Sequence, residues 1–111
     1  DVRAINTELK PNTIAFCTVD VTEVSLEKVL PFVHPVLSPE AEVLVLVKPQ
    51  LEVGKKELTR GVLKSKLAQQ TVLNEIKKMA GQNNLAYQDQ MVSPILGEGG
   101  NLEFFMLFKK I

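Results

Sequence analysis

The stretch Val43-Leu44-Val45-Leu46-Val47-Lys48-Pro49 decides the fold class of this 111-residue chain. Five consecutive apolar residues without polar alternation are typical of a strand that is buried on both faces of a parallel sheet. Lys48 and Pro49 close the run. The sequence therefore predicts a buried strand over 43–47, and Lys48 marks its carboxyl end.

A second apolar run lies upstream, from Ile14 to Val19, and it ends at Asp20. Ser25 is placed to cap a following helix, because its hydroxyl can accept a hydrogen bond from a backbone N–H of the first turn. Pro31 should kink this helix and Pro35 should end it. Its expected apolar face consists of Leu26, Val29, Leu30 and Val33.

The second half of the chain predicts a polar loop over 54–61, a helix from the cap Ser65 to Gly81, and two more strands over 85–92 and 102–108. About ten residues join these two strands, which leaves no room for a crossover helix. They should therefore pair as an antiparallel hairpin. Alternating strands and helices before them indicate an α/β sheet with right-handed crossovers.

Composition is that of one globular domain. Hydrophobic residues make up 45% of the chain and charged residues 23%, with 13 Lys and Arg against 13 Asp and Glu. A net charge of zero gives no overall field toward nucleic acid or an anionic membrane. Cys17 stands alone in an apolar run, so it is expected to be a buried thiol in a reducing compartment, and no apolar stretch approaches the length of a membrane span. We expect a cytoplasmic protein.

Positive charge is nevertheless concentrated between Lys48 and Lys66. This segment contains five Lys and Arg60, and its only acidic residues are Glu52 and Glu57. Beside a catalytic site such a loop can contact phosphates, which positions a nucleic acid without reading its sequence. A merely solvated loop is the alternative. The candidates for RNA contact are Lys55, Lys56, Arg60 and Lys64.

Three segments in this order resemble the second half of the hemolysin A-like ribosomal RNA methyltransferases, relatives of the FtsJ-type 2′-O-ribose methyltransferases. The usual family wording is close to VDVSFISL, KPQFEVG and SPIxGPxGNxEF. This chain has VDVTEVSL from Val19, KPQLEVG from Lys48 and SPILGEGGNLEF from Ser93. Glu23 replaces a usual aromatic residue, and the loop over 58–61 is shorter and poorer in glycine, which puts substrate contacts in doubt more than the fold.

The resemblance implies the C-terminal half of a Rossmann-like methyltransferase. Residues 1–111 would form one partial domain with three parallel strands, two helices and a last strand inserted antiparallel between its two predecessors. The family's glycine-rich S-adenosylmethionine loop lies upstream of these motifs and has no counterpart here. S-adenosylmethionine is thus the expected cofactor of a complete enzyme, and weak or no binding is expected for this chain. A start at Asp1 fits an excised or shortened polypeptide.

Asp20 and Lys48 each end a predicted parallel strand, so their side chains should share one rim of the sheet, where open α/β folds bind ligands. Glu103 begins the last strand and should reach the same rim if that strand runs antiparallel beside 43–47. The alternative is that the three charges only mark strand ends near solvent. Related 2′-O-methyltransferases use a Lys-Asp-Lys-Glu tetrad, and the resemblance assigns Asp20, Lys48 and Glu103 to its last three members.

In that assignment Lys48 orients the ribose hydroxyl and is a candidate acceptor of its proton, while the two carboxylates hold the lysine and Asp20 borders the cofactor pocket. The first lysine of the tetrad has no counterpart here. His34 is the only histidine, which excludes a His-based metal site or a Ser-His-Asp triad, so no metal is expected. Gly97, Gly99 and Gly100 do not join a strand to a helix and predict a turn instead of a phosphate loop.

The preferred interpretation is a fragment of an RNA ribose 2′-O-methyltransferase that acts on ribosomal RNA and is inactive when isolated. The alternative is a non-catalytic half-Rossmann module that binds a partner or RNA. Which nucleotide is modified stays open. The apolar strand over 14–19 would lack a neighbour on one edge, so we expect a homodimer or oligomer through it, or disorder of residues 1–19.

Overall fold

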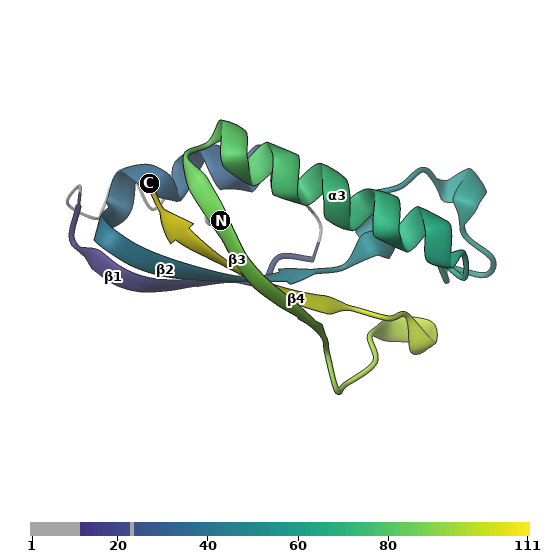
Figure 1. The fold of residues 1–111 in the computed structure, drawn as a ribbon. Helices are drawn as coiled ribbons and strands as arrows, with labels where there is room; N and C mark the ends of the chain where they lie inside the picture. Colours follow the sequence, from purple (N-terminus) through teal and green to yellow (C-terminus); the bar gives the residue numbers. More distant parts are fainter. Residues whose placement is uncertain (1–11, 23) are drawn as a thin grey trace.

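The computed structural model describes residues 12–22 and 24–111, and these form one four-stranded sheet with its helices on one side (Figure 1). The strand order is β1-β2-β4-β3. The strands are β1 (Ile14–Val19), β2 (Leu37–Val47), β3 (Leu85–Val92) and β4 (Phe104–Lys110). The α-helices are α2 (Leu26–Val29) and α3 (Lys66–Gln82), and the 3-10 turns are η2 (Leu30–Phe32), η3 (His34–Val36), η4 (Pro49–Leu51), η5 (Lys55–Glu57) and η6 (Glu98–Gly100).

The last strand lies where the resemblance places it. β4 pairs antiparallel with β2 on one side and with β3 on the other. The expectation of three parallel strands needs correction, because β1 and β2 form the sole parallel pair among the described strands. β3 has no parallel neighbour, since β4 occupies the position between it and β2.

The core lies between the sheet and a single helical layer (Figure 1). Alternate residues of β2 and β4 point toward the helices and are almost fully buried, with Val43, Val45, Met106 and Phe108 each 0% exposed. The helix α3 covers this face and begins as predicted, since the Ser65 hydroxyl accepts a hydrogen bond from the Ala68 N–H at 3.1 Å. Its buried residues are Gln69, Val72, Leu73, Ile76 and Ala80.

Prolines shape the segment between β1 and β2. The α-helical hydrogen bonding of α2 stops at Val29, and the chain continues as two 3-10 turns with Pro31 and Pro35 in their first positions. The predicted helix is therefore one α-helical turn followed by tighter turns. The cap is confirmed, because the Ser25 hydroxyl accepts from the Glu27 N–H at 3.2 Å.

The bounds of three elements differ from those predicted. β2 begins at Leu37 instead of residue 43 and contains Pro39 and Glu40, the latter with φ of 63°. The register with β1 jumps between Ile14 and Phe16, so this part of β2 forms a bulge in which a proline is tolerated. β4 starts at Phe104 instead of residue 102. The helix α3 continues to Gln82, because Asn84, with φ of 59°, makes the turn that Gly81 was expected to make.

The other face of the sheet has no helix over it among the described residues (Figure 1). Strands β1 and β2 were predicted to be buried on both faces, and this is wrong for the described chain: Phe16 is 55% exposed and Leu44 is half-buried. A shallow apolar hollow of about 390 Å³ lies on this face. It is lined by Leu44, Asp89, Gln90, Met91, Phe105 and Leu107.

Candidate active site

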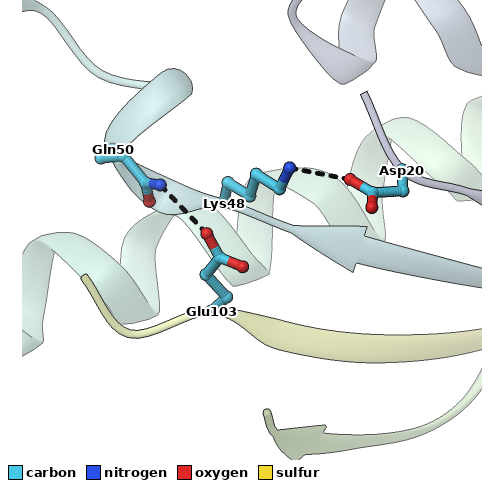
Figure 2. A network of polar contacts seen from close by, with 4 residues as sticks. All are labelled: Asp20, Lys48, Gln50 and Glu103. Carbon is cyan, nitrogen blue, oxygen red and sulfur yellow. Dashed lines mark hydrogen bonds and ion pairs between the residues drawn. The ribbon is translucent and has the colours of Figure 1, made fainter. Parts of the chain in front are cut away.

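Two parallel strands and one antiparallel strand bring three charged residues to the same edge of the sheet. Asp20 directly follows β1, Lys48 directly follows β2, and Glu103 directly precedes β4. Since β1 and β2 are parallel and β4 runs the opposite way, the ends of the first two strands and the start of the third coincide. Figure 2 shows the three side chains around the end of β2.

Lys48 and Asp20 form an ion pair. The Lys48 Nζ lies 2.7 Å from Asp20 Oδ1, and the lysine side chain is 13% exposed whereas the aspartate is 60% exposed. Because the lysine is nearly buried, its charge depends on this one carboxylate more than a surface lysine would. The pair holds the amine at the carboxyl end of the parallel strands.

Glu103 is held by a different partner. Gln50, in the η4 turn after Lys48, donates from Nε2 to Glu103 Oε2 at 3.3 Å (Figure 2). Within the described residues Glu103 forms no ion pair with Lys48. The expectation that both carboxylates hold the lysine is thus met by Asp20, while Glu103, 9% exposed, is fixed beside it.

A cavity of about 420 Å³ opens between the loop after β2 and the loop before β4. Lys48, Gln50 and Arg60 come from the loop after β2, and Glu98 and Glu103 come from the loop before β4. The complete lining is Thr22, Lys48, Gln50, Leu51, Leu58, Arg60, Gly61, Glu98, Gly99, Asn101 and Glu103. Of the four predicted RNA-contact residues only Arg60 lines the cavity; Lys55, Lys56 and Lys64 are exposed outside it.

Asn101 joins the two loops that frame the cavity, a role that the sequence did not indicate. Its side-chain oxygen accepts from the Leu63 N–H at 2.9 Å, and its amide donates to the carbonyl oxygens of Gly61 at 3.0 Å and Glu98 at 2.9 Å. The residue is 2% exposed. Its place in the SPILGEGGNLEF segment was the available signal.

Glu52 anchors the loop that follows Lys48, and it too was missed. Its carboxylate accepts a hydrogen bond from the Ser25 hydroxyl at 2.8 Å and from the Leu26 N–H at 3.2 Å. An acidic group at the first turn of α2 complements the free backbone N–H groups there. This contact ties the KPQLEVG segment to the helix between β1 and β2, and so helps to fix Lys48.

The glycine-rich segment and His34, the other candidates from the sequence, lie in a turn and near the C-terminus. The segment over 97–101 is a turn, as predicted, with Gly99 and Gly100 at positive φ. His34 lies near the C-terminal carbonyl, with 3.3 Å between its Nε2 and the oxygen of Ile111. In residues 12–22 and 24–111 no cluster of three or more His, Cys, Asp or Glu is arranged for a metal ion. Glu23 lies outside the described residues.

The model of the family described as FtsJ-like methyltransferase matches residues 1–110. The chain belongs to the FtsJ-like methyltransferase family. The family match covers both loops of the cavity and all three strand-end charges.

Two curated relatives of this FtsJ-like chain have names that refer to ribosomal RNA. The chain is 30% identical over 92 residues to YqxC of Bacillus subtilis, which is named as a candidate rRNA methyltransferase. This alignment covers 82% of this chain and 33% of YqxC. The chain is 30% identical over 108 residues to the 16S/23S rRNA (cytidine-2′-O)-methyltransferase TlyA of Mycobacterium tuberculosis, over 96% of this chain and 40% of that protein. The chain therefore spans well under half the length of either relative.

A solved relative gives the same picture at the level of the fold. A crystal structure from Lactococcus lactis, described as a candidate hemolysin, superposes with a TM-score of 0.92 at 28% identity. The match covers 100% of this chain and 54% of that one.

Among the described helices of this FtsJ-like chain, none has the length and apolar character that crossing a bilayer requires.

The family implies an S-adenosylmethionine cofactor, and the described residues fit one side of such a site. Asp20 is 60% exposed and directly follows β1, which is an edge strand among the described residues. Small-molecule sites enclose most of their ligand, and nothing described here closes the space beyond Asp20. A cofactor at this rim would need further walls besides the residues described here.

Proposed function

We propose that this chain is the catalytic C-terminal part of a ribosomal RNA 2′-O-ribose methyltransferase. The observation that carries the proposal is the ion pair of a nearly buried Lys48 with Asp20 at the strand-end rim, beside the fixed carboxylate of Glu103. Family membership supplies methyl transfer, and the names of both relatives refer to rRNA. The 2′-oxygen as acceptor rests on the printed name of TlyA alone.

Lys48 would orient the ribose hydroxyl in this mechanism. The Lys48 amine is held by Asp20 and presents N–H donors, which can hold the oxygen of the hydroxyl in place. Displacement at a methyl group requires the attacking oxygen, the carbon and the leaving sulfur to be aligned, and fixed donors supply that alignment. Orientation of the hydroxyl is therefore the first role that we propose for Lys48, and acceptance of the hydroxyl proton is the second.

Glu103 and Arg60, which both line the cavity, would contact the substrate. Glu103 Oε2 is bound to Gln50, which leaves its second carboxylate oxygen as an acceptor for a sugar hydroxyl. Arg60 lies in the loop after β2 and would contact a phosphate. The exposed Lys55, Lys56 and Lys64 extend the positive charge beyond the cavity. These contacts position RNA and do not read its bases.

S-adenosylmethionine, when bound in a complete enzyme, supplies the methyl group. The residues of this chain contribute the rim near Asp20, and the remaining walls would come from parts of a longer protein. Because the chain spans 33% and 40% of its two relatives, methyl transfer is proposed for the complete protein and not for the isolated segment.

The test is methyl transfer by the complete protein that contains this segment. Purified protein is incubated with labelled S-adenosylmethionine and with 16S or 23S rRNA, and 2′-O-methylation is mapped by resistance of the modified linkage to alkaline hydrolysis. We expect labelled RNA and a protected linkage. Label on a base would overturn the 2′-O assignment. Cofactor binding without any transfer, or no cofactor binding, would favour a non-catalytic module.

A further inference from the structure

We propose that Gly97 is a positioning residue that sets the place of the Glu103 carboxylate. The inference deepens the proposed function, on which its catalytic consequence rests. Gly97 lies at the start of the η6 turn and itself has no polar side chain to offer a substrate. Its effect would pass entirely through Glu103.

The contact between the two residues leaves no room for a side chain at position 97. A Cβ built on Gly97 would overlap Glu103 Oε2 and would lie 2.6 Å from Cδ and 3.1 Å from Cγ of the same side chain. Carbon atoms that are not bonded pack at about 3.5–4.0 Å. The carboxylate therefore occupies the volume that any other residue at position 97 would fill.

The backbone at Gly97 does not itself require glycine. Its φ of −81° and ψ of −171° are extended values that every residue adopts. Gly99 and Gly100 differ, because their φ values of 69° and 90° favour glycine on conformational grounds. The reason for glycine at position 97 is thus the neighbouring carboxylate, whereas at 99 and 100 it is the turn.

Glu103 Oε2 is confined from two sides by residues of different loops. Gln50 Nε2 donates to this oxygen at 3.3 Å, and Gly97 packs against the same atom. The other end of the Gln50 amide, Oε1, is buried and has no hydrogen-bond partner within the described residues. The orientation of that amide consequently depends on Glu103, which makes the Gln50 side chain a sensitive reporter of where the carboxylate lies.

A methyl group at position 97 would move Glu103 and not the loop. Gly97 is fixed by its own backbone, since its N–H donates to the Asn101 carbonyl at 2.8 Å and its carbonyl accepts from the Gly100 N–H at 3.0 Å. The overlapping atoms, in contrast, are the far end of a flexible side chain. Gly97→Ala should therefore displace the carboxylate at little cost in folding stability.

The first experiment follows the Gln50 side-chain amide of this chain in ¹⁵N–¹H spectra. Gly97→Ala should shift both Gln50 NH₂ signals toward those of Glu103→Ala, in which the acceptor is gone. The matched control is Gly81→Ala, because a Cβ at Gly81 meets nothing within 4 Å and φ is not positive there. We expect Tm of Gly97→Ala within about 2 °C of wild type. Unshifted Gln50 signals in folded Gly97→Ala would overturn the inference.

The second experiment measures methyl transfer by the complete protein. Displacing a substrate-contacting group by about 1 Å costs on the order of a hundredfold in rate, so Gly97→Ala should lower kcat by at least tenfold while KM for S-adenosylmethionine changes less than twofold. Shifted Gln50 signals with unchanged kcat would overturn the role of Gly97 in the reaction. If the wild-type protein transfers no methyl group, the proposed function fails, while the spectra still decide whether Gly97 places Glu103.

Discussion

The Lys48 amine lies 2.7 Å from the Asp20 carboxylate, although the two residues follow different strands. Parallel pairing of β1 with β2 brings the two strand ends together, and the lysine is nearly buried while the aspartate stays largely in solvent. An ion pair between a nearly buried lysine and an exposed carboxylate contributes little to folding stability, so its position at the strand ends is better explained by a role in a functional site.

Lys48→Ala in the complete protein should reduce methyl transfer by about a hundredfold or more, because the group that orients the reacting hydroxyl is lost. Cofactor affinity should change little. The control is Lys78→Ala, since Lys78 is exposed on α3 and outside the cavity. Single-turnover rates and calorimetric titration measure the two quantities. Near-normal turnover in the Lys48 variant would remove this residue from the mechanism.

The isolated 111-residue chain should bind S-adenosylmethionine weakly or not at all. Described residues offer one side of a pocket, and ligand affinity depends on enclosure. Isothermal titration calorimetry on the chain and on the complete protein, under one buffer condition, makes the comparison. Micromolar affinity for the isolated chain would show that its own residues enclose the cofactor.

The isolated chain should self-associate through β1 and the open face of the sheet. Among residues 12–22 and 24–111, β1 pairs with β2 alone, and Phe16 of this edge strand is 55% exposed. Phe16→Glu should weaken association in sedimentation experiments. Leu67→Glu, at a 78% exposed position of α3, is the matched control and should not. A wild-type monomer at high concentration would count against this edge as an interface.

Asn101→Ala should destabilise the chain by about 2–4 kcal/mol, because the variant removes the side-chain partner of the Leu63 N–H and the side-chain hydrogen bonds to the carbonyl oxygens of Gly61 and Glu98, of which Glu98 keeps the bond from the Asn101 N–H. Asp20→Ala should destabilise the chain less than Asn101→Ala, since Asp20 is 60% exposed and water can reach the space that its carboxylate leaves beside Lys48. Urea unfolding of both variants gives the comparison. Equal stability losses would contradict the assignment of Asn101 to structure and Asp20 to the site.

The Cys17 thiol should react slowly with iodoacetamide in the folded chain. Burial raises its pKa above the ordinary value of 9.0, so less of the reactive thiolate is present at a given pH. Labelling should accelerate as pH rises beyond that value, and it should be faster at pH 8 in urea than in buffer. Identical rates in the two solvents would show that the folded chain does not shield the thiol.

Local signals in the sequence determined the parts of the fold that depend on near neighbours. The bounds of β1 were predicted from its apolar run, and a strand was also predicted over the residues of β3. Ser25 and Ser65 cap helices because their hydroxyls reach N–H groups two or three residues away. The order of strand-end charges also predicted that Asp20 and Lys48 would meet, since parallel neighbours end at one edge.

Tertiary structure decided what depends on contacts between distant segments. Glu103 binds Gln50 and not Lys48, and Asn101 and Glu52 hold loops whose partners lie far along the chain. The sequence also did not predict that one face of β2 is open. Val43 and Leu44 are both apolar residues of one run, but the helical layer covers only Val43. Periodicity reports the preference of a residue for burial, but packing against other elements decides which residues are buried and which polar groups are paired.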